Sequence, residues 1–232
     1  MAGGNGLPSK KRSINPGICY RIFSIYYSTG IKFNKMIFQR GDFSSNSLSK
    51  GAVNESLAKV RTFSASSEST AKPTIFLAHK HDDLDDLQGV MGQLEQLGAK
   101  IYIDSMDNKM PQETSGVTAA RIKKVIKFCN KFILLATGKA IQSYWCNWEL
   151  GIGDTHKFIE HIAILPMKEK GAADSSWPGN EYLQIYPSIQ YEDGTSHYSN
   201  GNPIAKGYYV VKPPDVDGVR RYTSFNTWLS KR

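Results

Sequence analysis

The chain has 232 residues, of which 40% are hydrophobic, so it is long enough for one ordinary domain with its own buried core and some additional chain. Its formal net charge of +8 would suit a nucleic-acid or membrane-surface protein, but residues 1–72 hold 11 Lys and Arg against 3 Asp and Glu. The remainder carries no net charge, so we expect the globular part to bind neither nucleic acid nor a membrane.

Residues 1–72 are predicted to form a basic, serine-rich and largely irregular N-terminal extension. Thirteen of these residues are serine, and stretches such as "TFSASSESTAKP" are typical of loops. A short helix is predicted only at 51–61, where the apolar residues would share one face. We therefore place the start of the domain at residue 73.

The cysteines and the hydropathy indicate the compartment. The three cysteines, Cys19, Cys129 and Cys146, show no metal-ligand spacing, and their odd number gives no complete disulfide framework. No apolar run reaches the roughly 18 residues of a membrane-spanning helix. The first 41 residues hold seven basic and no acidic side chains, but no small-residue cleavage site follows them cleanly. We expect a cytoplasmic protein.

From residue 73 onward, short apolar runs alternate with segments of helical spacing. Strands are predicted at 74–79, 99–104, 131–137 and 161–167. Helices are predicted between them at 83–98, 117–130 and 143–156. Because short strand–helix–strand crossovers imply parallel pairing, the pattern predicts an α/β fold with a central parallel sheet and helices on both faces.

The pattern is weaker beyond residue 167. A short helix and turn are predicted within 181–194, and "GYYVVKPP" at 207–214 is expected to form an edge strand or an extended arm that the two prolines end. A final helix at 225–232 is expected to pack Phe225, Trp228 and Leu229.

Ligands of such sheets bind outside the carboxyl ends of the strands, so three segments are expected to meet at one rim. These are "AHKHDD" at 78–83, "DSMDNKMPQETSG" at 104–116 and "TGKAIQSYWCNWE" at 137–149. The rim is where we place the candidate site.

Glu149 is the strongest catalytic candidate at this rim. Ser143 is predicted to cap the helix that carries it, and Trp145 lies one turn earlier on the same face. A carboxylate beside an aromatic wall can stabilise a developing cation, which suits chemistry at an oxocarbenium-like carbon. The alternative is an acid placed near a helix N-terminus for electrostatic reasons, with the neighbouring Trp and Cys side chains in the core.

Other patterns are less specific. His79 and His81 form an HxH without a third ligand at clear spacing, so we expect a polar loop and no metal site. Asp82, Asp83 and Asp104 follow strands as in a receiver-type magnesium pocket, but the third strand ends in "LLATGK" without an aspartate. A dinucleotide fingerprint, a nucleophile elbow and a P-loop are absent.

Taken together, "TIFLAHKHDD", the proline-containing loop after the second strand and "SYWCNWEL" resemble a Toll/interleukin-1 receptor (TIR) domain. The most specific feature is the "WCxxEL" signature at 145–150, and the resemblance covers residues 73–167 well and the remainder loosely. It is strongest to prokaryotic, NAD-consuming TIR proteins of the Thoeris antiphage type. It implies a flavodoxin-like three-layer fold, with residues 73–232 as a TIR domain that has an elaborated C-terminal part.

The resemblance also implies site roles. Glu149 corresponds to the glutamate that is essential for cleaving NAD⁺ at the nicotinamide–ribose bond. Trp145, which lines the pocket in the family, and Cys146 of the same signature are implied as substrate-binding residues. Substrate contacts are implied for the loops after the first two strands, at Ala78, His79, Lys80, Asp104 and Ser105. The second of these loops, from Ser105 to Gly116, also mediates contacts between TIR domains in the family. Many members have Ser at the position of Ala78. Because alanine has no hydroxyl group, this chain could make only a backbone contact there.

The expected function is that of an NAD⁺ nucleosidase or ADP-ribose cyclase in antiphage defence or immune signalling. NAD⁺ would be the substrate, no cofactor would be needed, and the product would be ADP-ribose or a cyclic isomer. The resemblance further implies homo-oligomers built through TIR–TIR contacts and a downstream effector that senses a cyclic product. Two alternatives stay open: a non-catalytic TIR interaction module, and a nucleoside-processing enzyme of the deoxyribosyltransferase type on the same fold.

Overall fold

A twisted sheet forms the centre of the molecule in the computed structural model, which describes residues 37–46, 72–106, 115–173, 179–216 and 218–231. The sheet order within these ranges is β3-β2-β4-β5-β6-β7-β8, and β1 pairs with β5 beside this path. The strands are β1 (Phe38–Gln39), β2 (Thr74–Ala78), β3 (Lys100–Tyr102), β4 (Lys131–Ala136), β5 (Ile162–Lys168), β6 (Ser188–Glu192), β7 (Gly207–Lys212) and β8 (Arg221–Ser224).

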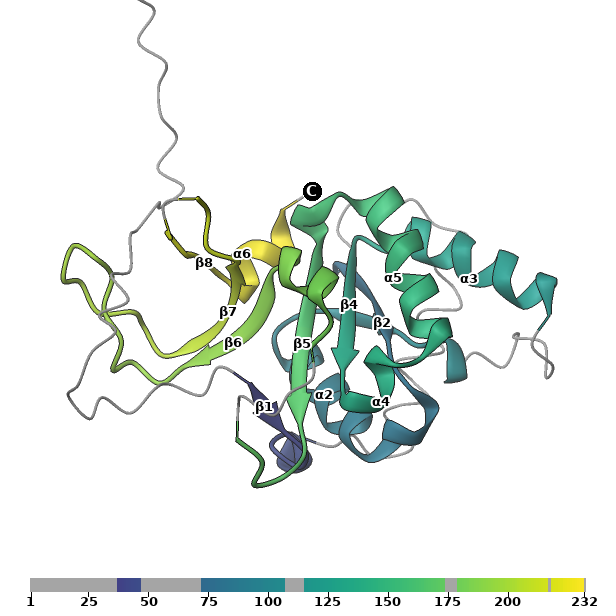
Figure 1. Cartoon of the computed structure of the whole chain (residues 1–232), viewed down its shortest axis with the longest axis horizontal. Coiled ribbons are helices and arrows are strands. Elements are labelled where there is room, and N and C mark those ends of the chain that lie inside the picture. Colours follow the sequence, from purple (N-terminus) through teal and green to yellow (C-terminus); the bar gives the residue numbers. More distant parts are fainter. Residues whose placement is uncertain (1–36, 47–71, 107–114, 174–178, 217, 232) are drawn as a thin grey trace, which may run out of the picture.

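The first five strands of this order pair in parallel, and β7 and β8 add an antiparallel hairpin-like extension. This order places β3 on one side of β2 and β4 on the other, which is the doubly wound arrangement of flavodoxin-like folds. The predicted α/β fold with a central parallel sheet is therefore confirmed. Figure 1 shows the extension curling away on the side of the sheet opposite α3.

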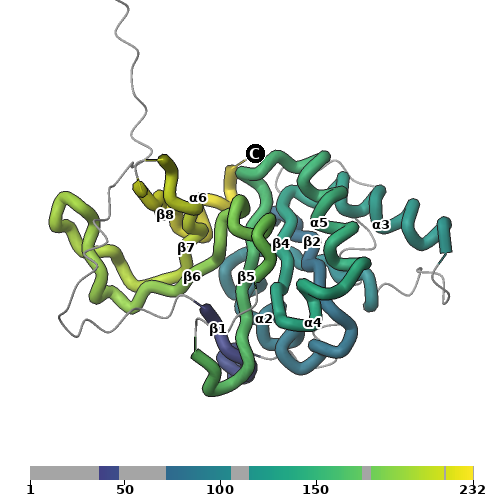
Figure 2. Tube along the Cα trace, viewed as in Figure 1, coloured from purple at the N-terminus to yellow at the C-terminus, as the bar shows by residue number. Residues whose placement is uncertain are grey.

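The helices are α2 (Leu84–Gln96), α3 (Gly116–Phe128), α4 (Gly138–Ile141), α5 (Tyr144–Lys157) and α6 (Phe225–Ser230). Side chains alternate along the buried strands β2, β4 and β5, so each of these strands contributes to two cores. One core holds Ile75 and Leu77 of β2 together with α2 and α6, and the other holds Phe76 with α3, α4 and α5. In Figure 2, α3 and α5 run beside each other, in agreement with their packing contacts.

Two predictions for the C-terminal part need correction. Within 181–194 only Glu181–Ile185 is helical, as a 3₁₀ turn, and Ser188–Glu192 is strand β6. The segment at 207–212 is not an edge strand, because β8 pairs along its outer side. The short β8 sequence "RYTS" is only half-buried, so it lacks the apolar alternation by which a strand is recognised. The final helix packs Phe225, Trp228 and Leu229 as predicted.

Part of the segment assigned to the N-terminal extension packs on the domain. β1 pairs with the carboxyl end of β5, with Phe38 opposite Met167, and both Phe38 and Phe43 are buried. The helix predicted at 51–61 lies outside the described residues. None of the helices described is long and apolar enough to cross a bilayer.

Candidate active site

Glu149 lies in the second turn of α5, and its side chain is buried against the rim of the sheet. Ser143 caps this helix, its hydroxyl accepting a hydrogen bond from the Cys146 backbone N–H at 3.4 Å. The residue is 1% exposed, and its Oε1 atom has no hydrogen-bond partner among the described residues. Since the helix dipole acts mainly within the first turn, burial dominates the electrostatics of this carboxyl group.

The pKa of Glu149 is raised well above its ordinary value of 4.5. Burial is the main cause, the negative charge of Asp104 adds to it, and a hydrogen bond from Trp145 opposes it. A buried polar atom without a partner is rare because it costs stability, and such atoms concentrate at functional sites. The oxygen is therefore available to a group that enters the site.

His79 connects the loop after β2 with the loop after β3. Its Nε2 lies 2.8 Å from the Ser105 hydroxyl and its Nδ1 lies 3.3 Å from the Leu77 carbonyl oxygen. Because a carbonyl only accepts, Nδ1 carries the hydrogen and Nε2 accepts from Ser105. Burial lowers the pKa of His79, against the opposing charge of Asp104 at 3.8 Å, which favours this neutral form.

Cys146 ties α5 to the same loop. Its thiol donates to the backbone oxygen of His79 at 3.2 Å, and burial raises the pKa of the thiol to about 11. A thiol that stays protonated is a poor nucleophile, so this side chain supports the loop geometry rather than attacking a substrate. Cys146 is 1% exposed.

An open hollow of about 480 Å³ lies beside these buried groups. Its lining comes from the loop after β2, from α4 and from the start of α5, namely Lys80, Asp82, Lys139, Gln142, Ser143, Tyr144 and Trp145. Trp145 connects the hollow with Glu149, since it lines the first and hydrogen-bonds to the second. The Trp145 ring also lies beside the Trp148 ring, tilted by 32° at a centroid distance of 5.0 Å.

The structure thus sorts the predicted site residues into two groups. His79, Asp104, Ser105, Cys146 and Glu149 form a connected group at the rim. Lys80 and Trp145 line the hollow, and Ala78 is fully buried beneath the loop. Residues 107–114 of the second loop lie outside the described residues.

The acids after the strands do not share one pocket. Asp83 is buried and accepts a hydrogen bond from the Thr137 hydroxyl at 2.6 Å, whereas Asp82 is exposed, with its carboxylate 3.7 Å from Lys139. Within the described ranges there is no cluster of three or more metal-ligating side chains. His79 and His81 only approach each other, with ring centroids 5.7 Å apart.

Sequence reasoning did not single out Lys139, Gln142 or Thr137. All three belong to the rim segment at 137–149, so their position after β4 was the available signal. Lys139 places a second cation beside Lys80 in the hollow. An anionic ligand would therefore meet two ammonium groups on its way to Trp145.

Comparison with known proteins finds one similar sequence to report. The chain is similar to the probable 3′ cyclic ADP-D-ribose synthase ThsB′ of Bacillus cereus (strain MSX-D12). The two sequences are 32% identical over 163 residues, which cover 68% of this chain and 75% of that protein. No family model matches the chain.

Proposed function

Because the chain belongs to the TIR-domain proteins of the Thoeris type, we propose that it cleaves the nicotinamide–ribose bond of NAD⁺ and acts in antiphage defence. The observation that carries the proposal is the buried carboxyl of Glu149 behind the wall of Trp145, with an oxygen that has no hydrogen-bond partner among the described residues. The similarity to a protein named as a cyclic ADP-ribose synthase supports the same substrate.

The chemistry needs one carboxylate and a dry site. When the bond between ribose C1′ and the nicotinamide nitrogen breaks, the electron pair leaves with nicotinamide, which becomes neutral and needs no acid. C1′ becomes an oxocarbenium-like cation, and the Glu149 carboxylate is placed to stabilise it in surroundings of low dielectric. The positive charge on the nicotinamide ring of bound NAD⁺ also opposes the raised pKa of Glu149 and favours its ionised form.

Two cations suit the diphosphate of NAD⁺. Lys80 and Lys139 line the hollow that leads to Trp145, together with Asp82, whose carboxylate lies 3.7 Å from Lys139. We assign the diphosphate to this hollow and the nicotinamide ribose to the side of Glu149. The side chains of Asp104 and Ser105 stay predicted substrate contacts, while His79 and Cys146 hold the two rim segments together.

We propose a cyclic isomer of ADP-ribose as the main product. Glu149 is 1% exposed, so bulk water has little access to the cation formed next to it. A hydroxyl of the same substrate molecule can then capture C1′, and its proton passes to the Glu149 carboxylate. The similarity to a protein named as a probable 3′ cyclic ADP-D-ribose synthase supports this outcome over hydrolysis.

The burial of Glu149 also favours the alternative, a non-catalytic module that signals by TIR–TIR assembly. As an enzyme, the protein would need the rim to open, and assembly into homo-oligomers is the proposed means. Buried free thiols at Cys129 and Cys146 suit the proposed cytoplasmic setting. An effector that senses the cyclic product would be the downstream partner.

Product analysis tests the proposal. Wild-type protein at several concentrations is incubated with NAD⁺, and the products are separated by chromatography. We expect nicotinamide together with an equimolar cyclic ADP-ribose isomer. Nicotinamide with linear ADP-ribose would contradict cyclisation only, whereas no nicotinamide at any concentration would contradict the enzyme and favour the interaction module.

A further inference from the structure

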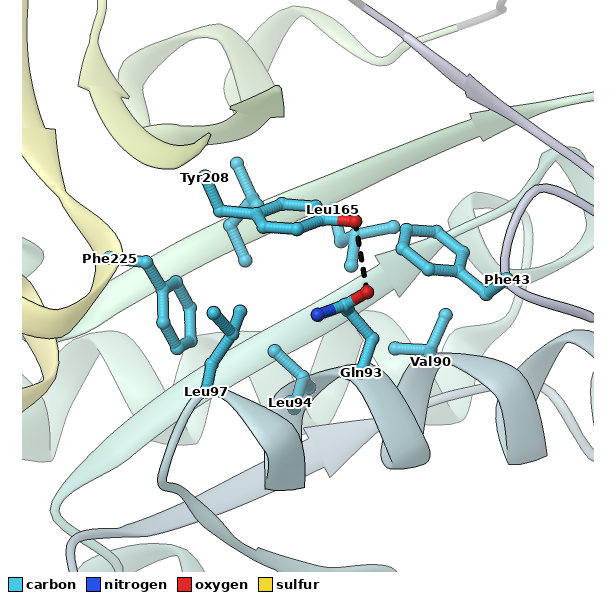
Figure 3. Close-up of a pocket in the computed structure, with 9 residues that line it drawn as sticks. Phe43, Val90, Gln93, Leu94, Leu97, Leu165, Tyr208 and Phe225 are labelled. Carbon is cyan, nitrogen blue, oxygen red and sulfur yellow. Dashed lines mark hydrogen bonds between the residues drawn. The ribbon is translucent and has the colours of Figure 1, made fainter. Parts of the chain in front are cut away.

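Residues 37–46 form a short clasp that packs on the opposite side of the sheet from Glu149. Phe38 and Phe43 are buried in the core that also contains α2 and α6. Figure 3 shows Phe43 facing Val90 across a small apolar pocket, with the Tyr208 hydroxyl donating to the Gln93 side chain at 3.0 Å. The remaining space is only about 10 Å³, so Phe43 is closely fitted there.

Arg40 lies between these two anchors and reaches three carboxylates. Its Nη2 atom is 2.5 Å from Asp83, its Nη1 atom 2.6 Å from Asp86 and its Nε atom 2.9 Å from Glu169. Asp83 and Asp86 come from the loop after β2 and the start of α2, and both are buried. The Gly41 backbone N–H adds a fourth contact, to Asp86 at 2.9 Å.

Asp83 also contacts the rim segment after β4. Its second oxygen accepts from the Thr137 hydroxyl at 2.6 Å, and the oxygen of Thr137 in turn accepts from the Ala140 backbone N–H at 3.0 Å. Thr137 is thereby the N-cap of α4, which carries Lys139 into the hollow. The chain of contacts crosses from the clasp to the point where the strand order reverses.

We propose that Arg40 is a positioning residue for the site of Glu149 and that it acts through Asp83 and Thr137. This inference rests on the proposed NAD⁺ cleavage. The guanidinium holds two buried carboxylates that would otherwise repel each other, and it thereby keeps the loop after β2 against the start of α4. These two segments supply the lysines of the hollow. The chain after α4 continues into α5, which carries Trp145.

A double-mutant cycle in the full chain tests the link. Arg40→Ala, Asp83→Asn and the double variant are compared for kcat and KM with NAD⁺, per folded molecule. A misplaced rim is expected to raise KM and to lower kcat/KM by about 10- to 100-fold. Because both residues act on the same contact, the double variant should lose no more than Asp83→Asn alone.

Two controls separate positioning from general stability. Glu169→Gln removes the exposed carboxylate of the same guanidinium and should change kcat/KM by less than about twofold. Arg40→Lys keeps the positive charge but lacks the planar guanidinium with its several N–H donors. Its activity should therefore lie between those of Arg40→Ala and the wild type. The proposal would be overturned if Arg40→Ala had the same KM as the wild type, or if the losses of kcat/KM in the two single variants added up in the double variant.

Hydrogen exchange gives a readout that does not depend on activity. In Arg40→Ala, amides at 79–86 and 137–143 should exchange faster, by about tenfold or more, while Glu169→Gln matches the wild type. An inactive wild type would contradict the proposed function, and the exchange rates would then still decide the inference. Unchanged exchange at both segments would overturn the link between Arg40 and the rim.

Discussion

At the scale of single residues, the burial of Glu149 has a cost that a matched substitution should reveal. An unfolded glutamate titrates near 4.5, and the folded group has a higher pKa because it is buried. Between these values the folded state binds more protons, so stability falls as the pH rises through this window. The wild-type protein therefore keeps its catalytic candidate at the expense of stability at neutral pH.

We predict that Glu149→Gln stabilises the protein by about 1–3 kcal/mol at pH 7, and that the gain disappears as the pH falls to about 4. Urea unfolding at both pH values measures the difference. Glu95→Gln is the control, since Glu95 is half-buried on α2, on the other face of the sheet. A variant no more stable than the wild type at pH 7 would contradict the account of this carboxyl group.

Lys131 is a second buried charge, at the amino end of β4. Its side chain is fully buried, with Nζ 2.6 Å from His161 Nδ1, 2.8 Å from the Lys231 backbone oxygen and 5.1 Å from the centroid of the Trp228 ring. Burial, with the nearby charges of Lys231 and Lys157, lowers the pKa of Lys131 from 10.5 to about 8. The folded state thus releases this proton before the unfolded state does.

Between pH 8 and 10.5 the unfolded state binds more protons at Lys131, so its contribution to stability rises with pH. We predict that the stability of the wild type, relative to Lys131→Met, increases by about 3 kcal/mol across this window. Chemical unfolding of both proteins at several pH values measures this difference, in which other titrating groups cancel. A constant difference would show that Lys131 is not held in a site that disfavours its charge.

At the scale of elements, the clasp and α2 approach each other at Gly89. A Cβ atom added there would lie 2.4 Å from the backbone oxygen of Phe43 and 2.7 Å from its carbonyl carbon. Because backbone atoms cannot rotate away, the clasp would have to shift. A glycine inside a helix is otherwise a weakness, since alanine at the same place favours the helix by about 1 kcal/mol.

We predict that Gly89→Ala destabilises the protein by about 1–3 kcal/mol despite this helix preference. Gly151→Ala in α5 is the matched control, because a Cβ there meets nothing within 4 Å. That variant should be more stable than the wild type by about 0.5–1 kcal/mol. Thermal unfolding of both variants checks the pair, and stabilisation of both would contradict close packing of the clasp on α2.

The parallel core and its helices could be predicted because their apolar residues recur at strand and helix spacing. The clasp could not, since β1 has only two residues and a polar stretch separates its anchors Phe38 and Phe43. The sequence suggested for Asp83 only a comparison with a magnesium pocket and singled out no role for Asp86, because their partner Arg40 lies more than 40 residues away in the chain. Long-range ion pairs leave no local pattern in a sequence.

The sequence predicted which residues belong to the candidate site, but it did not predict how deeply Glu149 is buried. The signature at 145–150 located Glu149 and Trp145 on one helix face, and the strand ends located the loops at 78–83 and 104–116. The complete burial of Glu149 depends on side chains from several elements, which spacing along one helix does not reveal. The assigned roles of these residues stay predictions.

At the scale of the whole molecule, the two faces of the sheet carry different parts of the proposed site. One face carries α5 with Glu149, and the other holds the clasp whose Arg40 reaches around the end of β2 to the rim. The antiparallel strands β7 and β8 form a small core of their own around Ile204, Tyr209 and Val211. They therefore extend the sheet away from the site.

The most direct test of the central claim is the rate of nicotinamide release from NAD⁺ by Glu149→Gln and wild type, each over a range of protein concentrations. We expect turnover by the wild type to increase with concentration as protomers assemble, and turnover by the folded variant to be lower by about 1000-fold or more. Glu95→Gln should match the wild type. A Glu149→Gln protein that releases nicotinamide at the wild-type rate would contradict the assignment of Glu149 as the catalytic residue.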